Sequence, residues 1–363
     1  MIDFDRSNAL PTLKTWLSAA VADGGSDLFF VPGAPVMLKR KGRMCALTAK
    51  KLSPADTRAL IDSIYNVQDG ESRNMRTLID TGDDDFSFTI RDVGRFRCNA
   101  YRQRNSLAAV LRVVPFGLPD ADALMIPRDV MSLADLPRGL VLVTGAAGAG
   151  KSTTLACLIH RINRTRSGHI VTIEDPIEFL HPHGNCIVSQ REVSHDTDNF
   201  SKALRAALRQ APDVVLLGEM RDTETIQTAM TAAETGHLLF STLHTVGAAK
   251  TIDRVIDAFP AVQQQQVRAQ LSLVLEAVVS QQLVPTKQGE LVPAFEVMHV
   301  NRAIRNMIRE GKIHQIDNVI AAHPLEGMRT MEQDLLRLYE NGYISRETAL
   351  QFALQPDIIE KKL

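Results

Sequence analysis

Cysteines are few in this chain of 363 residues, and long apolar runs are absent. The four cysteines lie far apart and form no C-x-x-C pair, so the sequence indicates neither a zinc ribbon nor a disulfide framework. Isolated thiols of this kind are typical of buried residues in a reducing compartment. No stretch approaches ~20 consecutive apolar residues, which predicts that no helix spans a membrane. The cysteines are Cys45, Cys98, Cys157 and Cys186.

The chain also lacks a strong charge of either sign. It has 41 Lys and Arg against 42 Asp and Glu, a net charge of −1, so no overall basic field favours nucleic acid as a partner. Its N-terminal Met-Ile-Asp-Phe-Asp lacks the basic and apolar regions of a signal peptide, and we expect a cytoplasmic protein. Hydrophobic residues make up 45%, which is ordinary for a soluble globular chain. The length predicts two domains.

The glycine-rich stretch from Gly145 to Ser152 points most directly to a function. It fits the pattern G-x-x-x-x-G-K-[ST], with an apolar strand-like run over 140–144 before it and helical spacing over 153–163 after it. A strand, a glycine turn and a helix N-terminus together bind phosphate. Lys151 would reach the β- and γ-phosphates of ATP, and the Ser152 hydroxyl would ligate Mg²⁺. The expected nucleotide-binding residues are Gly145, Ala146, Ala147, Gly148, Ala149, Gly150, Lys151, Ser152 and Thr153.

The first 114 residues predict an α+β domain with a mostly antiparallel sheet. Four prolines then punctuate the segment 115–137, which we interpret as an interdomain linker that is helical near 129–135. In the first domain, helices are expected over 9–22 and 53–65, and strands over 26–31, 36–39, 86–90, 96–100 and 107–114.

From residue 138 onward, strand and helix patterns alternate, which predicts a parallel sheet with helices on both faces. The tail from Arg302 to Leu354 is expected to be helical, with breaks at Gly311, at 324–327 and at Gly342. Strands are expected over 140–144, 169–173, 213–217 and 238–242, a hairpin-like stretch over 187–190, and helices over 198–209, 223–234, 248–259 and 261–282.

Three chemically capable side chains follow predicted strands directly: Glu174, Glu219 and His244. Ligands of such sheets bind at the carboxyl ends of the strands, so we expect these residues to share one site with the glycine-rich stretch. One glutamate would orient or deprotonate the attacking water, and the other would hold Mg²⁺ through its hydration shell. Surface carboxylates are the alternative. His237 and His244 flank one strand, and sensing of the γ-phosphate competes with a purely structural role for this pair.

Arginines crowd the later strands of the first domain. Arg95 and Arg97 share one strand face, and Arg102, Arg104 and Arg112 follow. A solvated charged face is the simplest interpretation. The alternative is that some reach the γ-phosphate of a neighbouring subunit, where a guanidinium stabilises the charge of the transition state.

Four segments together resemble the secretion ATPase superfamily and, within it, the type IV pilus retraction ATPases called PilT and PilU. A fifth segment, Ala303–Glu310, reads AIRNMIRE and is similar to the AIRNLIRE signature of the retraction branch. The long N-terminal extension and the cysteine-rich insert of the assembly branch are absent. The four segments are Gly145–Ser152 (Walker A), Ile173–Glu178 (Asp box), Leu216–Arg221 (Walker B), and Thr235–Leu238 with Thr242–Thr245 (His box).

The resemblance implies a PAS-like domain over 1–114, a RecA-like P-loop ATPase domain over 138–363 with C-terminal helices from about 301, and a homohexameric ring that binds ATP between its domains. Glu174 would be the catalytic glutamate, and Glu219 the Walker B glutamate that holds Mg²⁺ through water. His237 and His244 would be the His-box pair. The arginines of the family would map to Arg97, Arg104 and Arg112. Arg104-Asn105 departs from the usual Asn-Arg order and matches the PilU branch, which leaves the PilT or PilU role open.

The resemblance further implies a motor for pilus retraction and twitching motility, at the inner face of the cytoplasmic membrane. Its expected partners are an inner-membrane platform protein and, as a second candidate, a paralogous retraction ATPase. An accessory PilU-like subunit and a related secretion or conjugation ATPase stay open as alternatives. A DNA-dependent RecA-like ATPase could use the same nucleotide core. The neutral charge and the lack of a basic, aromatic-interleaved stretch argue against that class, so no nucleic acid is expected.

Overall fold

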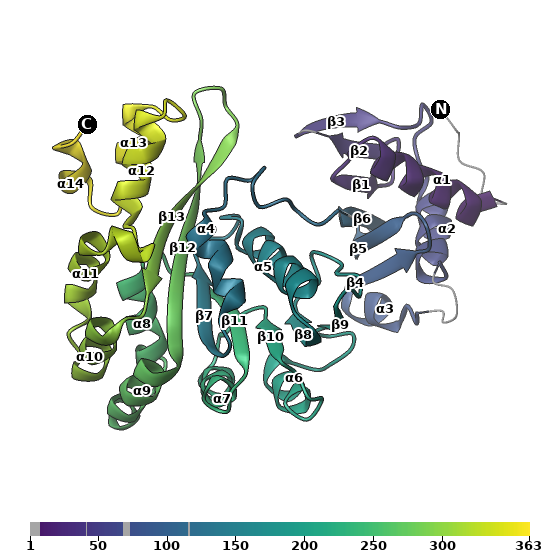
Figure 1. Ribbon diagram of the computed structural model, residues 1–363. Coiled ribbons are helices and arrows are strands. Elements are labelled where there is room, and N and C mark those ends of the chain that lie inside the picture. The colour runs from purple at the N-terminus through teal and green to yellow at the C-terminus, as the bar shows by residue number, and fades with distance from the viewer. Residues whose placement is uncertain (1–7, 41, 68–72, 115–116) are drawn as a thin grey trace. The chain divides into compact units, whose positions relative to one another are not determined.

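The chain forms two compact units, Met1–Gly117 and Leu118–Leu363 (Figure 1). The computed structural model describes residues 8–40, 42–67, 73–114 and 117–363. The division at Gly117 differs from the expected linker over 115–137, of which 115–116 lie outside the described residues. Ile126, Val130 and Leu133 are buried in the core of the second unit, because the apolar side chains between the prolines anchor this segment there. Its short helix α4 (Arg128–Met131) and the 3₁₀ turn over Ser132–Asp135 agree with the helical expectation.

The first unit is an α+β fold around an antiparallel sheet, as predicted. In its described part the sheet has six strands in the order β3-β2-β1-β6-β5-β4. Ser53 starts α2 with a capping box, since its hydroxyl accepts from the Asp56 N–H and the Asp56 carboxylate accepts from the Ser53 N–H. The sequence analysis did not anticipate β3 or α3. The elements are α1 (Ala9–Ala22), β1 (Asp27–Phe30), β2 (Met37–Arg40), β3 (Arg43–Ala46), α2 (Pro54–Tyr65), α3 (Arg76–Thr81), β4 (Asp83–Ile90), β5 (Gly94–Gln103) and β6 (Ser106–Val114).

The second unit is built on a seven-stranded sheet in the order β13-β12-β7-β11-β10-β8-β9. All neighbouring strands are parallel except the β12–β13 pair at one edge. The predicted RecA-like parallel-sheet α/β class is therefore confirmed. The elements up to the last strand are β7 (Gly139–Thr144), α5 (Lys151–Thr165), β8 (Gly168–Glu174), β9 (Cys186–Glu192), α6 (Phe200–Ala207), β10 (Val214–Leu217), α7 (Thr223–Glu234), β11 (Leu238–Leu243), α8 (Ala248–Asp257), α9 (Ala261–Val274), β12 (Leu275–Pro285) and β13 (Leu291–His299).

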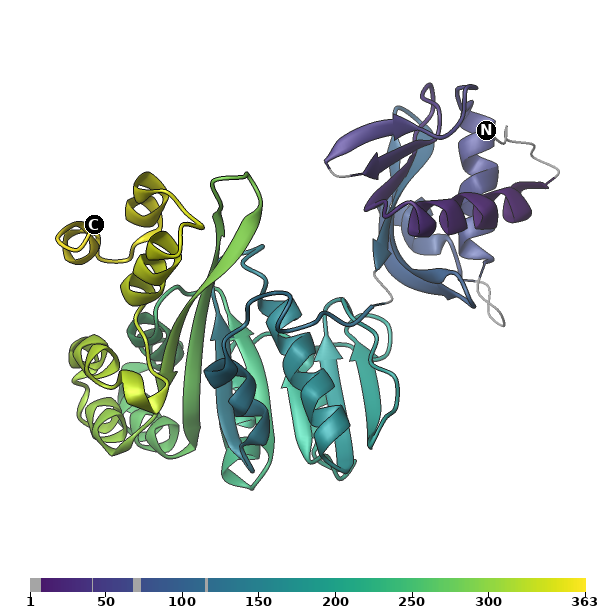
Figure 2. The same ribbon diagram turned by 45° about the horizontal axis from the view of Figure 1, so that its top comes forward.

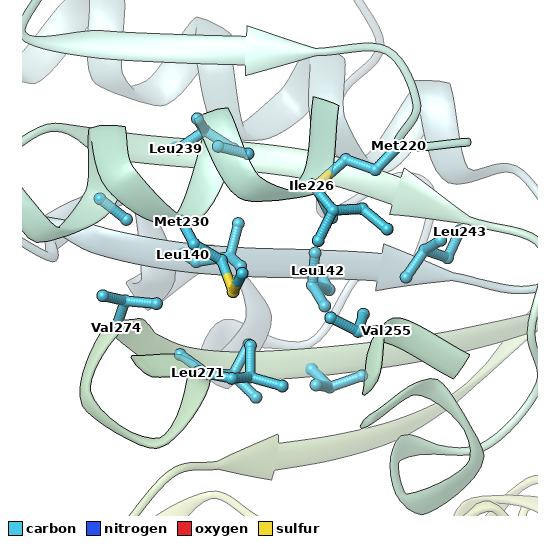
Figure 3. Close-up of a cluster of buried hydrophobic side chains, with 14 of the residues drawn as sticks. Leu140, Leu142, Met220, Ile226, Met230, Leu239, Leu243, Val255, Leu271 and Val274 are labelled. Atoms are coloured by element: carbon cyan, nitrogen blue, oxygen red, sulfur yellow. The ribbon is translucent and has the colours of Figure 1, made fainter. Parts of the chain in front are cut away.

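The central strand β7 shows why helices cover both faces of this sheet. All its residues are buried, and successive side chains of a strand point to opposite faces. Leu140 and Leu142 pack toward α7, α8 and α9 (Figure 3). Val141 and Val143 pack toward α5 and the α4 segment. A strand that is buried at every position and apolar on both faces thus requires a helical layer on each side.

The helix predicted over 261–282 is wrong beyond Val274. Leu275–Pro285 is strand β12, which lies parallel to β7 and antiparallel to β13. Ala277, Val278 and Val279 are fully buried, and the β-branched pair fits a strand between two neighbours. Helical periodicity continues across Val274, so the sequence pattern alone could not separate helix from strand here.

The hairpin-like interpretation of 187–190 is also wrong. These residues belong to β9, which pairs parallel with β8 from Gly168↔Cys186 to Glu174↔Glu192. Parallel neighbours need a crossover instead of a tight turn. Residues 175–185 make that crossover without a helix, and this brings Gln190 beside the end of β8.

The C-terminal region is helical with the predicted breaks. Gly311 ends α10 in the left-handed conformation with φ 72°, and the breaks at 324–327 and at Gly342 are also present. The last helices share a core with β12 and β13, and Figure 2 shows them in yellow beside the green strands. The elements are α10 (Arg302–Glu310), α11 (Ile316–Ala322), α12 (Met331–Glu340), α13 (Arg346–Phe352) and α14 (Pro356–Glu360).

A buried carboxylate joins α12 to the edge of the sheet. Asp334 is 1% exposed, and its Oδ2 accepts the backbone N–H of Phe295 on β13 at 2.9 Å. Its Oδ1 pairs with the guanidinium of Arg337 at 2.8 Å and with that of Arg329 at 3.4 Å. Arg329 also donates to Asp129 in α4 at 2.6 Å. One carboxylate therefore holds the C-terminal helices, β13 and, through Arg329, the α4 segment.

Arg305 in α10 closes the C-terminal end of α9. One of its nitrogens donates to three backbone carbonyls where α9 gives way to β12, and the other donates to both oxygens of Glu276 at 2.9 and 3.0 Å. A cation at a helix C-terminus satisfies carbonyls that have no partner within the helix. The three carbonyls belong to Ser272, Leu273 and Leu275.

We expect Arg305→Ala to destabilise the second unit by about 2–3 kcal/mol, because charge-assisted hydrogen bonds and a bidentate ion pair are lost together. Arg305→Lys should recover only part of this, since an ammonium cannot span the carbonyls and Glu276 at once. The measurement is chemical unfolding followed by circular dichroism. Arg309→Ala is the matched control, because Arg309 lies exposed on the same helix. Equal losses for both alanine variants would contradict the capping role.

All four thiols are free. Cys98, Cys157 and Cys186 are buried, and Cys45 on β3 is half-buried. Burial raises the pKa of the Cys98 and Cys186 thiols, and that of Cys157 to about 11. In the described ranges, the structure has no helix with the length and apolarity needed to cross a bilayer.

Candidate nucleotide-binding site

The loop between β7 and α5 requires glycine at two positions. Gly145 has φ 145°, and a Cβ there would lie 2.3 Å from the backbone oxygen of Gln281. Gly150, the residue before α5, has φ 84°, and a Cβ there would lie 2.9 Å from the side-chain nitrogen Nε2 of Gln281. Glycine adopts both dihedral angles without strain, and at Gly145 the backbone of Gln281 leaves no room for a side chain. The two glycines therefore allow a tight turn, and the N-terminus of α5 follows this turn directly.

Lys151 lies inside this loop. Its ammonium donates to the carbonyls of Gly145 and Ala146 at 2.8 and 2.9 Å. Burial lowers the pKa of Lys151, and the negative charges of Glu178 and Glu219 offset part of this decrease. The ammonium is thus held by neutral carbonyls with two carboxylates in range, and a phosphate group is a stronger partner for it than either carbonyl.

A cavity of about 550 Å³ opens beside the loop within the second unit. Glu174, Glu219 and His244 reach it from the ends of β8, β10 and β11, and residues 147–153 line it from the loop and α5. The structure therefore brings together the residues that follow three different strands. Gly145 and Ala146 take part through the carbonyls that hold Lys151.

Glu174 is the most strongly perturbed carboxylate of the cavity. Burial raises its pKa to about 7, against the opposing effect of hydrogen bonds from Thr172, Gln190 and the Glu178 backbone. Thr172 Oγ1 donates to Glu174 Oε1 at 2.6 Å, and Gln190 Nε2 donates to the same oxygen at 3.2 Å. A carboxylate with a pKa near neutrality is suited to general-base catalysis.

Glu219 occupies a different electrostatic setting. It pairs with Arg221, and His244 Nε2 lies 3.3 Å from its Oε2. The strand ends are held in register around it, since Thr242 Oγ1 donates to the Gly218 carbonyl and Met220 N–H donates to the Thr242 carbonyl. Glu219 thus has two cationic or potentially cationic neighbours, whereas Glu174 has neutral donors.

The structure separates His237 from His244. His237 precedes β11 and His244 follows it, so the six-residue strand places them roughly 20 Å apart. His237 Nδ1 lies 3.0 Å from the Ala232 carbonyl oxygen. The His237 side chain lines a different cavity, at the opposite edge of the sheet. Within one chain the pair therefore cannot act on one phosphate or bind one metal.

Two of the three candidate arginines lie in a ladder of charges across the sheet of the first unit. Arg97 and Arg112 are direct partners on β5 and β6. Each pairs with an acid on its other side, Arg112 with Asp27 at 2.9 Å and Arg97 with Asp85 at 4.0 Å. Arg104 lies in the turn between β5 and β6, where it and Asn105 have φ 45° and 62°, as in a type I′ turn. Arg97 and Arg112 therefore have acidic partners within the unit, and Arg104 is presented at a hairpin tip.

The residues around the cavity fit a nucleotide with Mg²⁺. Positive-φ glycines, the N-terminus of α5 and the Lys151 ammonium suit a polyphosphate. Ser152, the second residue of α5, also lines the cavity and supplies a hydroxyl oxygen. A hard cation prefers oxygen ligands and retains waters, which suits Ser152 with Glu219 behind a water molecule.

The sequence analysis missed several residues of the site. Thr172 and Gln190 bind Glu174, Gln281 accepts a hydrogen bond from Thr154 at 2.7 Å, and Arg221 binds Glu219. Thr172 was accessible from the sequence, since it lies two residues before Glu174 on a predicted strand. Gln190 and Gln281 were not, because they lie on β9 and β12, whose strand character or pairing was misjudged.

A phosphate-binding loop at the carboxyl edge of a parallel sheet, with two glutamates across it, defines the class of P-loop ATPases. The chain belongs to the type II/IV secretion system protein family, whose model matches residues 10–319.

Relatives in this family extend over nearly the whole chain. The type IV pilus retraction ATPase PilT of Pseudomonas aeruginosa is 45% identical over 341 residues, which cover 94% of this chain and 98% of PilT. PilU, a type IV pilus ATPase of the same organism, is 42% identical over 93% of this chain and 87% of PilU. A crystal structure of the pilus retraction motor PilT with bound ADP superposes with a TM-score of 0.87 at 45% identity, covering 96% of this chain and 98% of that one. The structure of the ATPase DotB of Legionella pneumophila superposes with a TM-score of 0.76 at 28% identity, covering 96% of both chains.

Proposed function

We propose that this protein is an ATP-hydrolysing motor that retracts type IV pili and so drives twitching motility. The observation that carries the proposal is one cavity shared by Lys151, Glu174 and Glu219 in a chain that is similar to PilT over 94% of its length. The relative of known structure that binds ADP is the pilus retraction motor itself. ATP is therefore the substrate, and ADP and phosphate are the products.

In this proposal Glu174 is the general base. It takes the proton of a water whose oxygen bonds to the γ-phosphorus, while the bond from that phosphorus to the bridging oxygen breaks and ADP leaves. Its pKa of about 7 keeps a large fraction of it ionised at neutral pH. Lys151 exchanges its two carbonyl partners for phosphate oxygens. His244 would respond to the γ-phosphate, and its contact with Glu219 supports this role.

Ser152 would hold Mg²⁺ directly, and Glu219 would hold it through water. When bound, the ion neutralises charge on the phosphate oxygens. Arg97, Arg104 and Arg112 belong to the other unit of the chain, and we propose that at least one of them acts on the nucleotide of a neighbouring subunit in a homohexamer. The motor would work in the cytoplasm at the inner face of the membrane, against an inner-membrane platform protein.

The enzymatic part of the proposal is tested with purified protein. Wild type should hydrolyse ATP, and Lys151→Ala should reduce hydrolysis to background because the β- and γ-phosphates lose their cation. Lys202→Ala is the matched control. Lys202 is an exposed lysine in α6, and it forms an ion pair with Asp198, which precedes that helix. A Lys151→Ala variant with wild-type activity would remove the enzyme assignment.

The cellular part is tested by deletion and complementation in the organism that encodes the chain. Surplus surface pili without twitching indicate loss of a retraction motor. Loss of pili would instead indicate an assembly function and contradict the proposal. Complementation with Lys151→Ala should fail, whereas complementation with Lys202→Ala should succeed.

An accessory PilU-like role is the second candidate. The Arg104-Asn105 order in the β5–β6 turn favours it, although the chain is 45% identical to PilT and 42% identical to PilU. The two roles separate in a strain that lacks every other retraction ATPase. A principal motor restores twitching there alone, and an accessory subunit does so only beside a second motor.

A further inference from the structure

Two side chains outside the nucleotide-binding motifs hold the carboxylate of Glu174. Thr172 Oγ1 and Gln190 Nε2 both donate to Oε1, at 2.6 and 3.2 Å. Thr172 is fully buried on β8, and Gln190 lies on the neighbouring strand β9. Since Thr172 precedes Glu174 by two residues, their side chains share one face of the strand. Both donors are thus fixed by the sheet.

Gln190 has no freedom to rotate its amide away from Glu174. Its Nε2 also donates to the Phe179 carbonyl at 2.9 Å, and its Oε1 accepts the His181 N–H at 2.7 Å. The amide nitrogen faces two acceptors and the amide oxygen faces a donor, so the opposite orientation would break all three contacts. Gln190 therefore ties the crossover segment over 175–185 to the carboxylate.

We propose that Thr172 and Gln190 are positioning residues for Glu174, which hold one carboxylate oxygen so that the group faces the attacking water ionised and in one orientation. This inference rests on the proposed function, in which Glu174 accepts a proton from water. Neither residue touches the substrate in this scheme. Each acts through the glutamate.

The charges around Glu174 agree with this role. Burial raises its pKa, Glu178 raises it further, and the two side-chain donors lower it. Donors to an ionised carboxylate favour the ionised form. Without them, more of Glu174 would be protonated at neutral pH. The other charged or titratable groups of the cavity and of the paired strand are Lys151, Asp175, Glu178, His181, Cys186, Arg191, Glu192, Glu219, Arg221 and His244.

Single-turnover hydrolysis of ATP by the full-length protein, measured from acidic to alkaline pH, tests the proposal. The wild-type rate should rise with pH, with the midpoint of the rise near the pKa of Glu174, because the base must be ionised. This rising part of the pH–rate profile is called the limb below. Thr172→Val keeps the branched shape and removes the donor. We expect its limb to move up by about one pH unit and its rate at pH 7 to fall about fivefold, with nucleotide affinity unchanged within about twofold.

Thr172→Ser is the matched control, because it retains the hydroxyl and should restore the wild-type limb. A Thr172→Val variant that binds nucleotide normally and keeps the wild-type limb overturns the proposal. Gln190→Leu tests the second donor by the same measurement. Should Thr172→Val fail to fold, Gln190→Leu decides: a limb shifted upward supports the positioning role, and an unshifted limb overturns it.

Glu174→Gln separates failure of this inference from failure of the proposed function. If Glu174→Gln hydrolyses ATP at the wild-type rate, Glu174 is not the base and the mechanism itself is wrong. If Glu174→Gln is inactive while both donor variants keep the wild-type limb, hydrolysis by Glu174 stands and only the positioning role is rejected.

Discussion

Replacing Glu174 by glutamine should lower kcat for ATP hydrolysis by about 10²–10⁴-fold, the range that a positioned general base contributes. Glutamine keeps the shape of the side chain and cannot accept the water proton. Nucleotide affinity should stay close to wild type, because Lys151 and the loop of residues 145–150 supply the phosphate contacts. The measurement is steady-state phosphate release combined with titration of a fluorescent nucleotide.

Glu178→Gln is the matched control for this variant. Glu178 lines the same cavity but is exposed, and its side chain acts on Glu174 only through charge, while its backbone hydrogen bond to Glu174 is kept in the variant. We expect its kcat to change less than about tenfold, since no proton transfer is removed. Equal losses in the two variants would mean that the cavity needs negative charge in general. A Glu174→Gln variant within about tenfold of wild type would refute the base assignment.

Replacing Asp334 by alanine should destabilise the second unit by about 3–5 kcal/mol, the cost of removing one partner from a buried ion pair. The change leaves the Phe295 N–H without its acceptor and leaves Arg329 and Arg337 without their shared carboxylate. For a unit of this size the loss corresponds to a decrease in Tm of roughly 10 °C. Circular dichroism during thermal unfolding measures it.

The single tryptophan gives this experiment an internal reference. Trp16 is the only tryptophan of the chain, and it is buried in the first unit at 3% exposure. Its fluorescence transition should stay in place while the circular dichroism transition of the second unit shifts down. Glu340→Ala in the same helix α12 serves as the control, because Glu340 is exposed and should cost less than about 0.5 kcal/mol. A comparable loss in Glu340→Ala would contradict the role of Asp334.

Most of the fold was predictable because its strands and helices have clean local signals. Leu140–Val143 is apolar at every position, and Ser53-Pro54 starts a helix by side-chain and backbone chemistry that depends on no distant residue. Where the apolar pattern suited both a helix and a strand, pairing with neighbouring strands determined the secondary structure. Leu275–Gln282 continues a helical pattern but lies between β7 and β13, and only their backbone hydrogen bonds make it a strand. Position in the sheet is a tertiary property that periodicity does not carry.

The candidate site shows the same division. Residues that follow a strand directly, such as Glu174, Glu219 and His244, could be assigned to one edge because parallel strands end together. The wide separation of His237 from His244 was also within reach of the sequence, because the strand predicted over 238–242 already lies between them. Gln190 depended on a crossover that the sequence analysis treated as a hairpin-like turn. Which arginine acts on the nucleotide stays a prediction, since their contacts to acids within the first unit say nothing about a neighbouring subunit.

The thiols described above have a practical consequence for studying motion in this protein. Only the thiolate reacts readily with maleimides, and burial keeps Cys98, Cys157 and Cys186 both inaccessible and protonated at neutral pH. Cys45, on the edge strand β3 of the first sheet, is half-buried and is therefore the most accessible of the four. Cys45 therefore offers an attachment point for one dye on the first unit without any substitution, and a second dye on the nucleotide would report any change in the distance between the two dyes during turnover.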